Sequence, residues 1–448
     1  MPSDAVGSSG GPFAFMIFGT TFYVITQAKH ASEIDKNTEA LSFDEFVQDF
    51  IRSAGLSESA VQACFLQRLA KEKSGFPNPS GHPLGILIRQ MQVHQLHPGV
   101  YQRALEARFL RSFHRQLRVE HISHITQAQT SGPISMYKWC ADFFTRAGEY
   151  AYFGNTLGDI DPDFSKKFYV FDELSWQITY RIPKLFAKKM SAAQNTLQRS
   201  LKTYFQIPQS QRDETAWFTT AVEDELRAIG VSDDDIATIF LTVYLTINTN
   251  TRRATFWMMA YILHSPSLVQ ALRNEIAQAF EGYDLVNPSY VFDKSLCPQL
   301  EAVWLETLRL SSSGSSVRCI NKDTIIGGKI LRKGNKIMIP SRLLHMDDTI
   351  YTEDSSLFRP ERFLDTGNRV RGGWWRPFGG GKSICTGRYV AEHAIKMCVS
   401  IILHRFDVRL TDGAHLPQGD EGIPGLGIMG LKKGEDTWDN VSARSFDG

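Results

Sequence analysis

The chain has no apolar run long enough to cross a membrane. A spanning helix needs about 20 consecutive apolar residues. The nearest candidate, PFAFMIFGTTFYVIT at residues 12–26, is interrupted by Gly19, Thr20 and Thr21. The residues on both sides of this break are β-formers, so the segment predicts a β-hairpin. The N-terminus also lacks a charged stretch followed by a small-residue cleavage site, which disfavours a signal peptide. We therefore expect no transmembrane anchor in this chain.

Charge is not in excess, and cysteine is not patterned. Lys and Arg number 49 against 48 Asp and Glu, a formal net charge of +1. This balance gives no reason to expect nucleic acid as a partner. The six cysteines are widely spaced and include no C-x-x-C pair. Such spacing disfavours a disulfide framework and favours an intracellular, reducing compartment.

The composition is that of a folded protein with a large core. The 448 residues are 42% hydrophobic and include 29 Phe, which argues against disorder. Residues 1–11 predict a flexible start, and no long linker or repeat divides residues 12–448. From about residue 40 to about residue 310 the pattern is mainly helical, and short strands and turns follow. These patterns predict one domain that is mainly α with a small β portion.

A long apolar helix is predicted after residue 232. Ser232 is suited to cap it, three acids follow in the first turn, and Ser265-Pro266 is suited to stop it. Its middle is unusual, because it contains Thr246, Asn248, Thr249, Asn250 and Thr251, then Arg252 and Arg253. Such residues weaken a buried helix, and a local break of this kind is typical of a functional surface. The alternative is an ordinary core helix.

The stretch FGGGKSICTGR, residues 378–388, permits two interpretations. The letters GGGKS resemble the end of a phosphate-binding loop. Such a loop requires another glycine five residues before the glycine that precedes the lysine. That position is Arg376, and the preceding segment is not a buried strand. The phosphate-loop interpretation is therefore rejected.

The second interpretation is a turn that presents a cysteine. Phe378, Gly381, Cys385 and Gly387 have the spacing F-x-x-G-x-x-x-C-x-G, which resembles the haem-binding signature of the cytochrome P450 superfamily. Glycines allow a tight loop, a following helix favours the thiolate, and an aromatic neighbour shields the sulfur. The alternative for Cys385 is a buried free cysteine in a turn.

Other motifs fit the same family in the expected order. The resemblance implies that Glu306 and Arg309, in LETLRL, form a structural charge network with Arg362, in FRPERF. It also implies that Arg318 binds a haem propionate, although a surface cation is an equal alternative. Residue 383 is Ser where the family usually has Arg or His, so Arg376 or Lys382 is expected to bind a propionate instead.

The long helix departs from the usual family pattern. Asn250 takes the place of the oxygen-handling threonine, Thr249 takes the place of the acid before it, and Thr251 follows. We take these three as candidate catalytic residues. The segment NTRRATFW resembles the branch that includes cholesterol 7α-hydroxylase, prostacyclin synthase and fungal relatives. Asn can still hydrogen-bond an oxygen, but without an acid its proton delivery must differ. The alternative is that Asn250 merely caps a local helix bulge.

The resemblance implies a single large cytochrome P450 haem domain over residues 12–448, with a long central helix crossing the haem. Haem b with Cys385 as axial ligand, O2, and electrons from NADPH through a cytochrome P450 reductase or similar donor are then expected. The expected function is a monooxygenase that oxidises an apolar sterol, terpenoid, alkaloid or polyketide in fungal-type secondary metabolism. Two alternatives remain: a haem-thiolate isomerase or dehydratase that needs neither reductase nor O2, and a non-enzymatic haem-binding or sensor protein.

The resemblance also implies where the substrate and the electron donor bind. We expect substrate near residues 248–252, enclosed by a loop at 76–100 and by helices around 165–215. No acid occurs from residue 366 to residue 391, which carries Arg369, Arg371, Arg376, Lys382 and Arg388, so this face suits an acidic donor protein. The protein is expected to be a monomer, cytoplasmic or peripherally associated with the endoplasmic reticulum.

Overall fold

A computed structural model of the chain describes residues 11–17, 19–69, 74–118, 135–352, 354–364, 372–410, 413–423, 425–436 and 438–444. The chain divides into two compact units. The first, here called the sheet unit, contains Met1–Asp49, Leu305–Cys385 and Glu421–Met429. The second, the helical unit, contains Phe50–Trp304, Thr386–Asp420 and Gly430–Gly448. The predicted flexible start covers residues 1–11, of which residues 1–10 lie outside the described residues.

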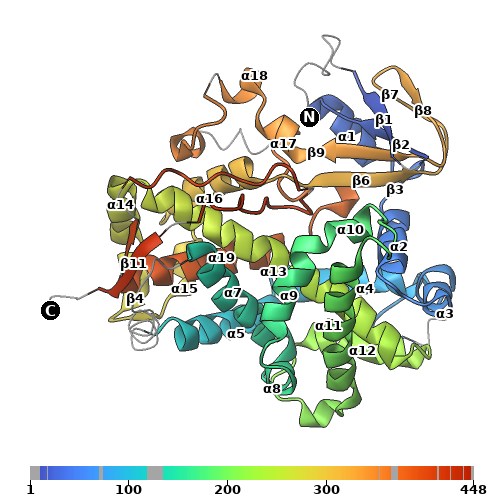
Figure 1. Cartoon of the computed structure of the whole chain (residues 1–448), viewed down its shortest axis with the longest axis horizontal. Coiled ribbons are helices and arrows are strands. Elements are labelled where there is room, and N and C mark those ends of the chain that lie inside the picture. The colour runs from blue at the N-terminus through green and yellow to red at the C-terminus, as the bar shows by residue number, and fades with distance from the viewer. Residues whose placement is uncertain are drawn as a thin grey trace. The chain divides into compact units, whose positions relative to one another are not determined.

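The sheet unit is built on a five-stranded sheet with the order β1-β2-β9-β6-β3. The strands are β1 (Phe13–Ile17), β2 (Thr20–Val24), β3 (Leu41–Ser42), β6 (Ser315–Ile320) and β9 (Lys336–Pro340). β1 and β2 form the predicted hairpin, and Figure 1 shows β9 and β6 beside them. β2 and β9 pair in parallel, whereas β9–β6 and β6–β3 are antiparallel. A second ribbon joins β7 (Thr324–Ile326) to β8 (Lys329–Leu331).

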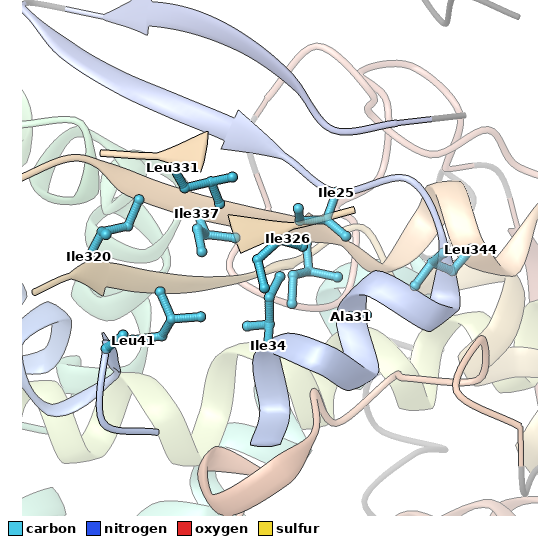
Figure 2. Close-up of a cluster of buried hydrophobic side chains, with 11 residues drawn as sticks. Ile25, Ala31, Ile34, Leu41, Ile320, Ile326, Leu331, Ile337 and Leu344 are labelled. Carbon is cyan, nitrogen blue, oxygen red and sulfur yellow. The ribbon is translucent and has the colours of Figure 1, made fainter. Parts of the chain in front are cut away.

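Aliphatic side chains from this sheet and from helix α1 (Ala28–Lys36) form the core of the sheet unit. Figure 2 shows Ala31 and Ile34 of α1 against Ile320, Ile326 and Ile337 of the strands, all of them buried. β-branched side chains suit such a pleated surface, which is why isoleucine is so frequent here. The packing fixes α1, which also contacts the short 3₁₀ turn Gly381–Ser383. The core therefore holds Asp35, next to Ile34, beside that turn.

Helix α13 (Asp233–Leu263) is the central element of the helical unit. It spans 31 residues and is buried over most of its length. The Ser232 side chain accepts a hydrogen bond from the Asp235 N–H at 3.2 Å, which confirms the predicted cap. The helix ends just before Ser265-Pro266, as predicted. Three helices pack around α13: α7 (Met136–Phe153), α11 (Lys188–Gln206) and α19 (Arg388–Arg405). Helix α5 (Val100–Gln116) packs on α7 and α19. Helix α9 (Phe164–Leu174) packs on α7 and α11.

The remaining elements are short or peripheral. The other helices are α2 (Asp44–Ser53), α3 (Glu58–Val61), α4 (Leu84–Leu96), α8 (Thr156–Ile160), α10 (Trp176–Thr179), α12 (Trp217–Ala228), α14 (Pro266–Ile276), α15 (Pro288–Phe292), α16 (Pro298–Ser311), α17 (Ser341–His345) and α18 (Asp348–Tyr351). A π-helical turn covers Gln62–Leu66, and further 3₁₀ turns cover Gln209–Gln211, Ala277–Ala279 and Pro360–Phe363. The other strands are β4 (Phe280–Glu281), β5 (Asp284–Leu285), β10 (Phe406–Leu410) and β11 (Trp438–Ala443).

The predicted fold class, mainly α with a small β portion, is confirmed. One local prediction needs correction, because most of the expected loop at 76–100 is helix α4. Leu84, Leu87 and Met91 are buried on one face of α4 at helical spacing. The proline and glycine residues before them are typical of a loop, which is why the sequence predicts a loop here. Within the described parts of the chain, no helix combines the length and the hydropathy that a membrane span requires.

Candidate active site

Cys385 differs from the other cysteines in its exposure to solvent. Its residue is exposed, Cys319 is half-buried, and the remaining four cysteines are buried. Burial raises the pKa of the Cys64 and Cys297 thiols to about 12 and raises the pKa of Cys140 and Cys398 still more strongly. A buried thiol that resists ionisation is a poor metal ligand, since the thiolate is the species that binds metal. Cys385 is therefore the thiol best placed to bind one.

The loop that presents Cys385 depends on two glycines with left-handed backbone. Gly379 has φ +76 and Gly381 has φ +61, values that side chains rarely allow. A Cβ atom on Gly381 would also lie 2.8 Å from the Cβ of Asp35. The Cys385 N–H donates to the Phe378 carbonyl at 3.0 Å, which closes the turn. As predicted, a helix follows directly, since Gly387 precedes the first residue of α19.

Two buried arginines of the sheet unit lie beside this loop. Arg318, on β6, donates to the Ser383 hydroxyl, and its Nη2 lies 3.9 Å from Asp35 Oδ1. Arg376 Nη1 lies 2.8 Å from Asp35 Oδ2, while Arg376 Nε and Nη2 have no hydrogen-bond partner. Two guanidinium groups thus approach one carboxylate, and Arg376 retains two buried donors. Lys382, by contrast, is exposed and lies 3.5 Å from the Thr38 hydroxyl.

This arrangement fits a group that carries a thiolate-bound metal and carboxylates, which haem does. The fit rests on the exposed Cys385 in its glycine turn and on the orphaned donors of Arg376 beside it. A buried cation with unsatisfied N–H groups is best stabilised by an anionic acceptor. Arg318 and Arg376 are consequently better placed than Lys382 to bind propionates.

The predicted charge network is assembled in the sheet unit. Glu306 accepts from Arg309 Nε and Nη2, both at 2.7 Å. Arg362 Nε lies 3.4 Å from Glu306 Oε1. All three residues are buried. Arg309 also donates to the carbonyls of His345 and Ser355, at 2.9 and 2.6 Å. The network therefore ties α16 to the segments that follow β9.

His345 connects this network to the cysteine loop, and no sequence pattern predicts this role. Its Nε2 accepts from the Arg376 backbone N–H at 2.9 Å, and its Nδ1 lies 3.1 Å from the Arg309 carbonyl. Burial lowers the pKa of His345 to about 3, so the ring is neutral at physiological pH. A neutral ring must then carry its proton on Nδ1 and donate to Arg309. His345 thus fixes the backbone at the start of the loop.

In the helical unit, the centre of α13 has one accessible stripe. Thr242, Thr246 and Asn250, four residues apart, are half-buried or exposed, and so is Thr251 beside them. The Thr246 and Thr251 hydroxyls donate to the carbonyls of Val243 and Ile247, at 2.8 and 2.7 Å. Of the three candidate catalytic residues, Asn250 and Thr251 therefore lie on the stripe.

Thr249 lies off the stripe and is buried. Its hydroxyl donates to Asp172 Oδ1, on α9, at 2.6 Å. Asp172 Oδ2 accepts from Arg253 at 2.8 Å and also from Arg252. Burial acts to raise the pKa of the Asp172 carboxyl, but the attraction of Arg253 and Arg252 outweighs burial and lowers the pKa. Asp172, which the sequence analysis did not single out, is thus an ionised carboxylate in the core.

A small cavity of about 10 Å³, with room for about one water molecule, lies along the same helix. Its lining is mainly apolar, with two hydroxyls and one amide: Phe50, Ala54, Phe171, Ile178, Gln194, Thr238, Leu241, Thr242 and Leu245. Phe171, Ile178 and Gln194 come from the helical region that was expected to enclose substrate. Thr242 belongs both to the cavity and to the accessible stripe that includes Asn250. The helical unit therefore places an apolar pocket next to the candidate catalytic residues.

The chain resembles known proteins over most of its length. The family model described as Cytochrome P450 matches residues 87–433. Cytochrome P450 monooxygenase nodJ from Hypoxylon pulicicidum is 24% identical over 416 residues, which cover 88% of this chain and 76% of nodJ. Cholesterol 7-alpha-monooxygenase from Cricetulus griseus is 27% identical over 325 residues, which cover 66% of this chain and 63% of that relative.

A solved structure shares the fold. The retinoic acid-bound cyanobacterial CYP120A1 matches with a TM-score of 0.72 and 16% sequence identity, covering 99% of this chain and 95% of the other. At this identity the likeness establishes the fold alone. The family model and the two relatives carry the assignment to a family.

Proposed function

Because this chain belongs to the cytochrome P450 family of haem-dependent oxidoreductases, we propose that it is a monooxygenase that oxidises an apolar small molecule. The observation that carries the proposal is the loop Phe378–Cys385, which presents an exposed thiol in a glycine turn directly before α19. Thiolate ligation is the feature that distinguishes this family's haem chemistry from that of His-ligated haem proteins.

Each part of the sheet unit has a proposed role. Bound haem supplies reductive activation of O2, with electrons from NADPH through a reductase. Cys385 would supply the thiolate ligand, and Arg318 and Arg376 would bind the propionates. Phe378 shields the sulfur from water. The network of Glu306, Arg309 and Arg362 keeps the loop in place through His345 and acts structurally.

Asn250 is proposed to hold and orient oxygen on the α13 side. Its amide Nδ2 donates hydrogen bonds and its Oδ1 accepts them, but neither atom releases a proton at neutral pH. Protons must therefore reach the site through water held by Asn250 and by the hydroxyls on its stripe. The Thr251 hydroxyl, which lies on that stripe and donates to the Ile247 carbonyl, can still accept a hydrogen bond from such water.

The apolar lining of this small cavity supports a substrate with little charge, which must widen the cavity to enter it. Phe171, Ile178, Leu241 and Leu245 give it hydrocarbon walls, and Gln194 supplies an amide that can orient a hydroxyl or carbonyl. We propose a sterol, terpenoid, alkaloid or polyketide. One relative is named as a cholesterol monooxygenase, and the other comes from a fungus, which supports a sterol-like or fungal secondary metabolite.

The segment between α10 and α11 supports peripheral association with an anionic membrane such as the endoplasmic reticulum. Leu185 and Phe186 are 68% and 74% exposed, and Lys184, Lys188 and Lys189 flank them. No Asp or Glu occurs between Glu173 and Asp213. An apolar pair in a basic setting favours the surface of an anionic bilayer. Arg369 and Arg371, two of the cations expected to face an electron donor, lie outside the described residues.

A second candidate function is a haem-thiolate isomerase or dehydratase. The presence of Asn250 where the family usually has a threonine favours this second function, because the accessible stripe of α13 carries no acid for proton delivery. The two candidates differ in what they require. Purified protein should be assayed with a panel of apolar substrates, with and without NADPH, reductase and O2. Oxygenated product that needs all three supports the monooxygenase, and product formed without them would sink it.

A further inference from the structure

The centre of α13 is composed of residues that weaken a helix, yet it is continuous helix in this protein. Thr and Asn side chains compete with the backbone for hydrogen bonds. A helix made of them in a core needs contacts from neighbouring elements to stay ordered. Those contacts come from α9 on one side and from α7 on another.

The contact from α9 is made by one carboxylate. Asp172 is fully buried and accepts from Thr249 at 2.6 Å and from Arg253 at 2.8 Å, while Arg252 bonds the same oxygen as Arg253. These partners occupy both carboxylate oxygens. Three residues of α13, all within one turn of Asn250, are thus held by a single side chain.

The second contact comes from α7. Gly148 leaves room for Asn248, because a Cβ at that position would lie 2.3 Å from Asn248 Oδ1. The Arg252 guanidinium lies 5.7 Å from the ring centroid of Tyr137 on α7 and 5.3 Å from that of Tyr169 on α9. These distances allow cation–π attraction, which stabilises the buried Arg252 guanidinium.

α9 also contributes to the cavity. Phe171, the neighbour of Asp172, lines it together with Thr242 of α13. A substrate that widened this cavity by displacing Phe171 would therefore act on the same turn of α9 that holds Thr249. The two sites are connected through one turn of helix rather than through a long path.

We propose that Asp172 is a positioning residue, which holds the α13 turn at Thr249 and thereby sets the orientation of Asn250. Its effect on catalysis rests on the monooxygenase function proposed above, whereas its effect on the order of α13 does not. Thr249, taken from the sequence as a candidate catalytic residue, acts in this scheme through its bond to Asp172.

The chain provides a matched control. Glu223, on α12, is also a buried carboxylate between two arginines, with Arg212 Nη2 at 2.5 Å and Arg227 Nε at 2.9 Å. Among the described residues, the Glu223 carboxylate bonds to Gln209, Arg212 and Arg227, none of which belongs to the turn around Asn250. Glu223→Gln therefore removes the same kind of charge from the same unit without releasing that turn.

The first test measures the order of α13 without turnover. Amide hydrogen exchange is followed across residues 246–251 in the intact protein carrying Asp172→Asn, Thr249→Val, Thr249→Ser or Glu223→Gln. We expect Asp172→Asn and Thr249→Val to raise exchange there about tenfold, the loss expected for one charge-assisted hydrogen bond. Thr249→Ser keeps the hydroxyl and should resemble the wild type, as should Glu223→Gln. Unchanged exchange in Thr249→Val overturns the proposal. This variant keeps the ion pairs, so it tests the idea even where Asp172→Asn does not fold.

The second test measures the fraction of NADPH electrons recovered in product at saturating substrate. We expect Asp172→Asn and Thr249→Val to lower this coupling at least threefold, and Thr249→Ser to restore it. Faster exchange with unchanged coupling would show that the contact is only structural and overturn the positioning role. If the wild type forms no product with NADPH, the proposed function fails, and the exchange experiment still decides whether Asp172 orders α13.

Discussion

Replacing Glu306 by Gln tests the buried charge network most sharply. Glu306 is fully buried and compensates two buried cations, Arg309 and Arg362. It also accepts the Arg359 backbone N–H at 2.9 Å. Gln keeps the shape and one acceptor but removes the charge, so the Arg309 guanidinium remains in the core without its counter-ion, while Arg362 keeps its ion pair with Asp354 at 2.8 Å.

The expected loss follows from this burial. Removing one partner of a buried ion pair costs about 3–5 kcal/mol, because the remaining charge is uncompensated. Unfolding entropy is about 2.1 cal/mol/K per residue, or about 0.9 kcal/mol/K for 448 residues. The midpoint of thermal unfolding should therefore fall by about 3–5 °C. Arg309 gives a second reason for a loss, because its donors to the His345 and Ser355 carbonyls are oriented by Glu306.

The assay is thermal unfolding monitored by circular dichroism, with Glu421→Gln as the control. Glu421 pairs with Arg342 at 2.5 Å, but both side chains are partly exposed, and such pairs contribute about 0–1 kcal/mol. The control should shift the midpoint by less than about 1 °C on the same entropy scale. A Glu306→Gln midpoint equal to that of the control would refute the claim that this network braces the sheet unit.

Three further predictions concern pH, backbone and cofactor retention. Burial, the largest cause, raises the pKa of Glu149 from 4.5 to about 7. The folded state therefore binds the Glu149 proton more tightly than the unfolded state does. This difference contributes on the order of 3 kcal/mol to the free energy of unfolding. The contribution is fully present below pH 4.5 and is lost as the pH rises past 7. Glu149→Gln should flatten the fall in urea midpoint between about pH 5 and 8, and an unchanged slope would contradict the assignment. Gly381→Ala should destabilise the protein more than Gly334→Ala does. Both glycines have positive φ, but of the two only Gly381 has another atom close to the position of an added Cβ. Equal urea midpoints for the two variants would exclude a steric clash at Gly381. Arg376→Gln should weaken haem retention in a transfer assay to apomyoglobin, whereas Lys382→Gln should not, and the reverse order would reassign the propionate partner.

Local signals were enough to predict much of this molecule. The hairpin at 12–26, the Ser232 cap and the helix after Cys385 depend on neighbouring residues, and all three are confirmed. The motif around Cys385 is also local, since its glycines serve the turn that contains the cysteine. Patterns of this range can be found in one sequence because their physical causes lie within a few residues.

Long-range partners could not be predicted in this way. Asp172 meets Thr249 across 77 residues, and His345 meets Arg376 across 31. A single Asp in an amphipathic helix or a single His in a short one has no spacing that distinguishes it from a surface residue. The sequence identified Thr249 as unusual, but which side of α13 it faces depends on tertiary contacts with α9.

The ligand of the iron is the most direct test of this account. Purified protein reconstituted with haem should be reduced and treated with carbon monoxide, and its Soret band compared with those of Cys385→Ala and Cys64→Ala. The wild type and Cys64→Ala should show the red-shifted band of thiolate-ligated haem, and Cys385→Ala should lack it while keeping its circular dichroism. Retention of the shifted band in Cys385→Ala would place the ligand elsewhere and contradict the assignment.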